Sequence, residues 1–224
     1  MAKKKESTLI NMLVALLVIA AVSGGVLGLV YGVTKDTIAE VDQKKNETAI
    51  KAVLPLENVT YKADTMKYNY EGVDLTFPCN LAYDANGNFQ GAAVKTSEGG
   101  FGGKIDMMVG FLADGTIKGT SVLSHAETPG LGANMTGKFK DQFVDKNPNN
   151  FKLIVKKDGG DVDAITAATI TSRAFSKAVD KAYQAFMANK AQFMNNTPTK
   201  EAAPAVEEAP AEENNETEGG QSNE

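Results

Sequence analysis

The sequence predicts an α+β protein that has a single N-terminal transmembrane helix, a domain with a mainly antiparallel sheet and packed helices, and a disordered C-terminal tail. Three observations predict this class. Residues 9–33 are apolar and carry no charge, short runs of β-prone residues flank Asn-Gly and Asp-Gly turns, and a long amphipathic segment follows those runs. Strands joined by tight turns and followed by a helix are typical of the α+β class.

The apolar stretch at residues 9–33 is long enough to cross a bilayer. As a helix that rises about 1.5 Å per residue it would span roughly 37 Å, and the hydrocarbon core is about 30 Å thick. A cleaved signal peptide is the alternative, but its apolar region usually has only about 7–15 residues. We therefore expect an uncleaved transmembrane anchor.

Three lysines indicate the orientation of the anchor. Lys3, Lys4 and Lys5 lie in the short segment of residues 1–8, and short basic flanks are usually retained in the cytoplasm. We therefore expect a single-pass protein of the cell (inner) membrane with a cytoplasmic N-terminus. The bulk of the chain is then extracytoplasmic, or periplasmic where there is an outer membrane.

Residues 34–55 are expected to form a juxtamembrane helix that continues from the anchor. Thr34 can cap this helix, and Pro55 can close it because proline cannot continue a helix. Its apolar face is thin and consists of Ile38, Val41, Ile50 and Val53. The segment is predicted to act as a stalk.

Residues 56–196 contain the signals of a sheet. Each predicted hairpin has two β-prone runs and a turn whose residues tolerate positive φ. The first hairpin joins Leu81–Tyr83 to Phe89–Val94 through Ala85–Asn88, and the second joins Lys104–Leu112 to Thr116–Leu123 through Ala113–Gly115. Phe151–Val155 (FKLIV) is a further strand candidate and is followed by a polar turn at residues 156–160.

A long helix is predicted from about Thr171 to Met194. Its apolar residues recur at intervals of three and four, which produces one apolar face that can pack on a sheet. These residues are Phe175, Ala178, Val179, Ala182, Tyr183, Phe186 and Met187. Residues 197–224 hold almost nothing apolar larger than Val206 and are predicted to form a disordered acidic tail.

The composition excludes several kinds of site. The net charge of −5 arises in the tail, where eight glutamates after Thr197 stand against Lys200, so no basic face for nucleic acid is expected. Cys79 is the single cysteine and His125 the single histidine, which excludes an internal disulfide, an iron–sulfur cluster and a multi-histidine metal site. Any Ser/His/Asp triad would need His125. Redox chemistry in this chain would therefore require an organic cofactor.

The stretch Asp163–Ser172 (DAITAATITS) places small residues and hydroxyls before and at the start of the predicted long helix. Free backbone N–H groups and the positive end of the helix dipole make such a start an anion site, and a phosphate would fit there. The same threonines and serine could equally be plain helix caps. The residues alone leave both interpretations open.

This stretch resembles the flavinylation motif Asp-x-x-Ser/Thr-Gly-Ala-Thr of FMN-binding electron-transport subunits, in which the final threonine accepts the FMN phosphate. The resemblance makes Thr169 the residue that carries FMN through a phosphoester. Asp163 occupies the place of the leading acid, Thr166 that of the hydroxyl and Ala168 that of the alanine. Ala167 stands where the family usually has glycine, which removes freedom at positive φ.

Two further segments resemble the same family. Gly99–Ile105 resembles its glycine-rich strand entry, and His125–Gly132 resembles its Glu-Thr-Pro-Gly-Leu-Gly loop. Pro129 and Gly130 favour a tight turn there, which lets backbone amides approach a flat ring. The resemblance implies further cofactor-binding residues, among which Thr128 is expected to hydrogen bond to the ring. They are Glu127, Thr128, Gly130, Leu131 and Gly132 in this loop, and Ile170 and Thr171 beside the motif.

Two residues have both a functional and a plain interpretation. Lys156 could contact the phosphate or the ring, but a lysine beside a glycine turn is usually only solvated. His125 could tune the flavin, but a neutral histidine beside a turn is more often structural. No catalytic residue and no metal ligand is predicted.

Over residues 1–195 the chain most resembles the G subunit of the Rnf electron-transport complex and is similar to the C subunit of sodium-pumping NADH:quinone oxidoreductase. The first resemblance implies an electron-transfer subunit with covalent FMN, in a membrane complex that couples electron transport of the ferredoxin-to-NAD type to ion translocation. It also implies other membrane subunits and a flavin transferase as partners. Three alternatives remain: the C subunit, a free-standing extracytoplasmic electron shuttle, and a cofactor-free tethered binding module in which Thr166–Ser172 is only a helix cap.

Overall fold

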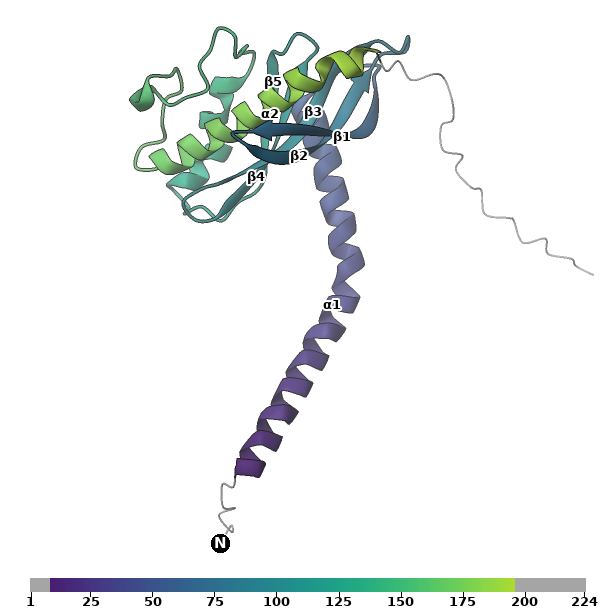
Figure 1. The fold of residues 1–224 in the computed structure, drawn as a ribbon, viewed down its shortest axis with the longest axis vertical. Helices are drawn as coiled ribbons and strands as arrows, with labels where there is room; N and C mark the ends of the chain where they lie inside the picture. The colour runs from purple at the N-terminus through teal and green to yellow at the C-terminus, as the bar shows by residue number, and fades with distance from the viewer. Residues whose placement is uncertain (1–8, 196–224) are drawn as a thin grey trace, which may run out of the picture.

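The computed structural model describes residues 9–195, and the predicted basic start at residues 1–8 and acidic tail at residues 197–224 lie outside them. Within this range, a long helix, α1 (Leu9–Val53), leads into a domain that holds five strands, three short 3-10 helices and a second long helix, α2 (Thr169–Asn195). Figure 1 shows α1 extending away from the domain and α2 lying along the sheet.

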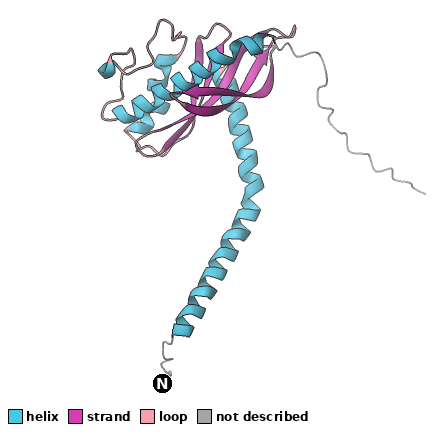
Figure 2. Ribbon diagram, in the orientation of Figure 1, coloured by secondary structure: helices cyan, strands magenta, loops and turns pink. Residues whose placement is uncertain are grey.

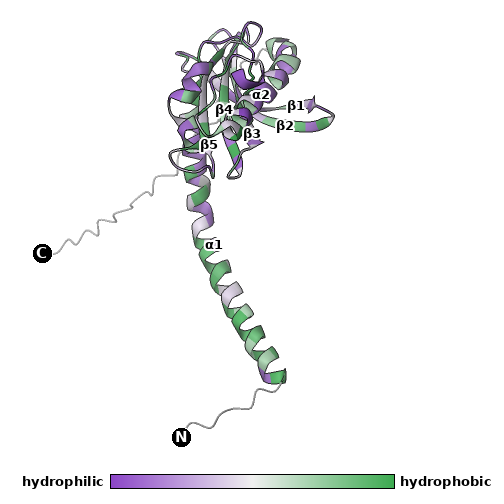
Figure 3. Cartoon of the chain, turned by 90° about the vertical axis from the view of Figure 1, so that its left-hand side faces the viewer, coloured by the Kyte–Doolittle hydropathy of each residue, from purple (hydrophilic) through white to green (hydrophobic). Residues whose placement is uncertain are grey.

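α1 is one continuous helix of 45 residues. It contains the one stretch in residues 9–195 that is long and apolar enough to cross a membrane, and the side chains of that stretch are exposed. Figure 3 shows the far half of α1 as hydrophobic and the half beside the domain as mixed. The helix ends at Val53, two residues before Pro55, as the sequence predicts.

The predicted cap at Thr34 is wrong. Its hydroxyl donates to the carbonyl oxygen of Val30 at 2.8 Å, which is the contact of a threonine inside a helix and not of a cap. Because α1 runs unbroken through this position, the anchor and the juxtamembrane segment form one element.

The sheet is antiparallel throughout, and its strands lie in the order in which they occur in the sequence. They are β1 (Thr60–Tyr70), β2 (Val73–Tyr83), β3 (Phe89–Gly99), β4 (Lys104–Leu112) and β5 (Ile117–Ser124). The two predicted hairpins, β2–β3 and β4–β5, are confirmed, and so is the α+β class. Figure 2 shows the strands in magenta beside the helices in cyan.

The sequence does not predict β1 or the first eight residues of β2, because the predicted strand covers only Leu81–Tyr83. Only Met66 is buried in β1, so the strand lacks the alternation of apolar and polar residues that marks a half-buried strand. Instead, β1 pairs along its whole length with β2, through a turn in which Glu71 and Gly72 have positive φ.

The predicted strand at Phe151–Val155 is wrong. This segment is irregular, and its ladder contact is an isolated parallel bridge between Val155 and Val162. The chain turns back at Gly159, which has a φ of 87°, so several backbone groups of residues 152–162 bond to one another. The apolar side chains of the segment still reach the core, which explains why its composition suggests a strand.

Two apolar layers hold the helices on opposite faces of the sheet. The larger layer lies between the sheet and α2, where the rings of Phe111 and Phe186 stack with centroids 5.1 Å apart. The smaller layer packs Val53 of α1 against Met108 and its neighbours. Successive side chains of a strand point to opposite faces, so β4 contributes to both layers.

The end of α1 rests on two glycines of the sheet. Gly110 and Gly119 are paired across β4 and β5, and a Cβ at Gly110 would overlap the carbonyl oxygen of Val53. Only glycine leaves room for this approach, so the helix lies directly on the strands. The sheet therefore joins α1 and α2 in one packed unit.

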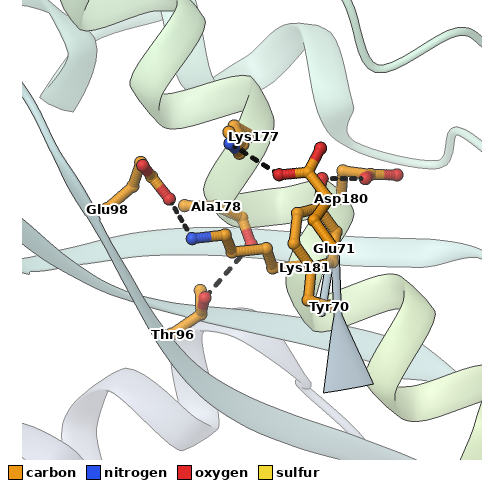
Figure 4. Close-up of polar contacts among 8 residues, drawn as sticks. All are labelled: Tyr70, Glu71, Thr96, Glu98, Lys177, Ala178, Asp180 and Lys181. Carbon is orange, nitrogen blue, oxygen red and sulfur yellow. Dashed lines mark hydrogen bonds and ion pairs between the residues drawn. The ribbon is translucent and has the colours of Figure 1, made fainter. Parts of the chain in front are cut away.

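A polar cluster holds the β1–β2 turn against α2 (Figure 4). The hydroxyl of Tyr70 donates to Asp180 at 3.0 Å, and Lys177 pairs with Glu71 at 3.2 Å. Burial, reinforced by Asp180, raises the pKa of Tyr70, so this phenol stays protonated and keeps its donor role. These contacts fix α2 along the sheet and thereby fix the position of its first turn.

Candidate functional site

The first turn of α2 has no side-chain cap. Its first helical hydrogen bond runs from the Ser172 N–H to the carbonyl of Ala168 at 3.0 Å, so Ala168 is the N-cap residue, and its side chain has no oxygen. The N–H groups of the turn therefore lack intrahelical partners, and the turn holds no acidic side chain. The positive end of the α2 dipole is available to an anion.

A pocket of about 400 Å³ lies beside this turn. Three segments line it: the glycine-rich entry to β4, the loop after β5 and the start of α2. The lining residues are Phe101, Glu127, Thr128, Leu131, Gly132, Ala167, Ala168, Thr169, Ile170 and Thr171. All of them except Phe101 are predicted cofactor-binding residues, so the structure brings most of the predicted set together.

Glu127 joins the three segments. Its side chain is buried, one carboxylate oxygen accepts from the Gly102 N–H at 3.0 Å, and the other accepts from the hydroxyl of Thr171 at 2.7 Å. A buried carboxylate needs such donors, because an unpaired buried charge is costly. Glu127 thus acts as a structural link that sets the loop after β5 against α2.

The glycines around Glu127 are needed for space. A Cβ at Gly100 or at Gly132 would overlap the Glu127 carboxylate, and a Cβ at Gly102 would overlap the carbonyl of Ala126. The glycine-rich entry and the loop therefore approach each other more closely than other residues would allow.

The loop after β5 contains the predicted tight turn. Gly130 has a φ of 77°, and the Leu131 N–H donates to the carbonyl of Thr128 at 3.2 Å. Leu131, Phe101 and Ile170 are all exposed large apolar side chains, and all three line the pocket. Exposed apolar groups gathered at a pocket favour a ligand with apolar surface.

The comparisons with known proteins agree with this geometry. The model of the FMN-binding domain matches residues 100–184, a range that contains every lining residue of the pocket. The G subunit of the ion-translocating oxidoreductase complex from Aliivibrio fischeri is 36% identical over 190 residues, which cover 80% of this chain and 88% of that protein. The chain belongs to the family of G subunits of ion-translocating oxidoreductase complexes.

Other members of this G-subunit family are similar to the same extent. The G subunit of the Na(+)-translocating ferredoxin:NAD(+) oxidoreductase complex from Acetobacterium woodii is 36% identical, over 76% of this chain and 88% of that protein. Among solved structures, the C subunit of the Na(+)-translocating NADH-quinone reductase from Parabacteroides distasonis has a TM-score of 0.49 and 19% identity. The match covers 69% of this chain and 94% of that one. The predicted resemblance to the G subunit is confirmed by the Aliivibrio and Acetobacterium matches.

Four predicted residues, three from the family's motif and loop together with Lys156, lie away from the pocket lining. Gly130 shapes the turn, and Thr166 is exposed beside a separate hollow. Asp163 and Lys156 form an ion pair at 2.7 Å, and Gln142 holds the backbone of Asp163 through its amide. Lys156 is therefore engaged with the leading acid of the motif.

The lysine that reaches Thr169 is Lys157, which the sequence does not single out. Its Nζ lies 3.4 Å from the hydroxyl oxygen of Thr169. The next residue, Asp158, forms two hydrogen bonds with Arg173 of α2, at 2.7 and 2.8 Å. These bonds to Arg173 hold the pKa of the Asp158 carboxyl below its usual range. The sequence contains two adjacent lysines, and only the fold decides which one lies beside Thr169.

Ala167 adopts the backbone conformation that the family's glycine would favour. Its φ is 59°, in the left-handed region that side chains with a Cβ rarely occupy. The chain before α2 therefore holds a residue with a Cβ in a strained backbone conformation.

His125 and Cys79 are not among the lining residues of the pocket. His125 is exposed, and its Nδ1 accepts from the Glu127 N–H at 3.2 Å within the turn. Cys79 is buried in β2, and burial raises the pKa of its thiol to about 12. Within residues 9–195 no group of His, Cys, Asp and Glu could hold a metal ion.

Proposed function

We propose that this chain carries FMN, bound through a phosphoester to Thr169, as the electron-transfer subunit of a membrane complex that couples electron transport to ion translocation. Family membership and the matched FMN-binding domain support the flavin and the complex. The observation that carries the choice of Thr169 is the accessibility of the hydroxyls around the start of α2.

Four hydroxyls lie near this helix start, and they differ in what they can reach. Thr171 is 1% exposed and donates to Glu127, and Ser172 is buried and bonded to Ala168 and Ile165. Thr166 is exposed but lies outside the pocket lining. Thr169 combines a half-buried, reachable hydroxyl with a place in the pocket.

The start of α2 also suits a phosphate. A phosphoester keeps one negative charge, and the uncapped N–H groups of the first turn, together with the helix dipole, stabilise such a charge. Lys157 supplies a cation beside Thr169. This arrangement favours a phosphate over the alternative in which these hydroxyls only cap the helix, because the N-cap residue is Ala168.

The rest of the pocket suits the flavin ring. Its volume of about 400 Å³ lies within the range of small-molecule sites, and Phe101, Leu131 and Ile170 offer apolar surface. The backbone of the loop and the hydroxyl of Thr128 are the polar groups that would orient the ring. When bound, FMN supplies the transfer of one or two electrons, and the protein binds and orients it.

The covalent attachment is tested by expressing the full chain with a flavin transferase in an exporting host and separating it on a denaturing gel. Wild type should show flavin fluorescence, and Thr169→Val should not. Thr166→Val should keep the fluorescence, since that hydroxyl lies outside the pocket. Thr171→Val should also keep it, although the Glu127 carboxylate then loses a donor, which costs about 1–3 kcal/mol of stability. Fluorescence that persists in Thr169→Val would contradict the proposal.

We further propose that residues 9–33 anchor the chain in the cell (inner) membrane beside other subunits, and that residues 56–196 form an extracytoplasmic FMN-binding domain. Gly24, Gly28 and Gly32 recur every fourth residue of α1, and such spacing lets membrane helices pack closely. In mild detergent the protein should co-purify with membrane partners. Gly28→Leu should reduce the amount of partner protein that co-purifies more than the matched change Leu27→Ile does. If the wild-type flavoprotein instead purifies alone, it is a free-standing shuttle.

A further inference from the structure

Three consecutive side chains of a short 3-10 helix contact the flavinylation motif or the first turns of α2. This helix, η3 (Lys156–Asp158), lies beside the start of α2. Lys156 pairs with Asp163, Lys157 reaches Thr169, and Asp158 pairs with Arg173. Each of these contacts joins η3 to a different point of the motif or of the helix that follows it.

We infer that Lys157 is the positioning residue for the phosphoester on Thr169, neutralising its charge and orienting it, and that the Asp158–Arg173 pair holds Lys157 in place. This inference rests on the proposed attachment of FMN to Thr169. It assigns different tasks to two adjacent lysines that the sequence does not distinguish.

The contacts separate the two lysines. The Nζ of Lys156 lies 2.7 Å from a carboxylate oxygen of Asp163, so its charge is already balanced by an acid. The Nζ of Lys157 lies 3.4 Å from the Thr169 hydroxyl oxygen, which has no charge. The charge of Lys157 is therefore the one placed to balance an anion attached to Thr169.

The Asp158–Arg173 pair fixes the place of Lys157. Arg173 lies four residues after Thr169, so both side chains project from the same face of α2. Its guanidinium forms a two-point contact with the Asp158 carboxylate, and such contacts are geometrically specific. With Asp158 tied to α2, the neighbouring Lys157 is placed over Thr169.

The test compares single variants of the full chain, each co-expressed with limiting flavin transferase and analysed by intact mass. Lys157→Met should lower the rate of flavin attachment about two- to five-fold, as expected for loss of one exposed charge contact. Lys157→Arg should restore the rate, because it restores the cation. Lys62→Met, which changes an exposed lysine of β1 outside the site, controls for net charge and should match wild type.

Phosphorus NMR of the flavin-loaded protein provides a readout that a purely structural role would not affect. The resonance of the phosphoester should shift in Lys157→Met and remain at its wild-type position in Lys156→Met. The inference would be overturned if the resonance shifted in Lys156→Met alone. It would also be overturned if both variants had equal attachment rates and unshifted resonances. Neither result would contradict the attachment of the flavin to Thr169. Absence of flavin from wild type would instead overturn the proposed function.

Discussion

Ala167 has a Cβ but adopts a left-handed backbone conformation, which favours glycine. A left-handed φ costs a residue with a Cβ about 1–2 kcal/mol, and glycine avoids most of this cost but loses more entropy on folding. We predict that Ala167→Gly raises the free energy of unfolding by about 0.5–1 kcal/mol. Ala85→Gly, in an exposed turn without positive φ, should instead be neutral or destabilising. Thermal unfolding of the purified proteins compares the two, and equal effects would contradict the assignment of strain.

The Asp158–Arg173 pair predicts a pH dependence. The pKa of Asp158 is lowered in the folded protein from an ordinary value of 3.8, chiefly by its hydrogen bond to Arg173. Its contribution to stability is therefore present above about pH 4 and is lost as the pH falls through the lowered pKa. Arg173→Met lacks the pair, so its deficit in melting temperature relative to wild type should shrink between about pH 6 and pH 3. A deficit that stays constant over this range would contradict the role of the pair.

At the scale of single residues, the sequence predicts what a motif defines and misses what only the fold defines. The resemblance to the flavinylation motif singles out Thr169 and its neighbours, which the structure gathers at one pocket, and Pro129 and Gly130 predict the turn of the loop. The positions of Phe101 at the pocket and of Lys157 beside Thr169 do not follow from the sequence, because they depend on the path of the chain. The aromatic residue inside a glycine-rich run was the available signal for Phe101, whereas Lys157 carries no signal that separates it from Lys156.

At the scale of elements, the contact between α1 and the sheet sets how the domain is oriented relative to α1. We predict that Gly110→Ala destabilises the protein by about 1–3 kcal/mol, because its Cβ would overlap the Val53 carbonyl and force the helix off the strands. Gly99→Ala is the matched control, since nothing lies within 4 Å of that position. Thermal unfolding should separate the two, and limited proteolysis near Val53 should increase only in Gly110→Ala. Equal melting temperatures would contradict the role of Gly110.

The sequence predicts the helices and strands whose own residues carry a recognisable pattern, such as a turn motif or an apolar face. The β2–β3 and β4–β5 hairpins have glycine turns between β-prone runs, and α2 has a clear apolar face. The sequence does not predict β1, because this strand is polar and is stabilised mainly by its pairing with β2. The predicted strand at Phe151–Val155 is wrong for the opposite reason: its residues are apolar and some are buried, but their backbone is irregular.

The whole molecule joins a helix that is long and apolar enough to cross a membrane, a sheet and the pocket beside α2 in one packed unit. From this arrangement and the lysines at residues 3–5 we predict an extracytoplasmic domain. A reporter enzyme whose disulfides form only outside the cytoplasm should be active when fused after Met194 and inactive when fused after residue 8. The opposite pattern of reporter activity would show that the anchor is inverted.

The central claim is that one hydroxyl, that of Thr169, carries the flavin. The most direct measurement is peptide mass spectrometry of the protein extracted from its native membrane. We predict that the peptide spanning residues 161–173 carries the mass of FMN less one water, with fragment ions that place it on Thr169. A bare peptide, or the same mass on Thr166 or Thr171, would show that Thr169 does not carry the flavin.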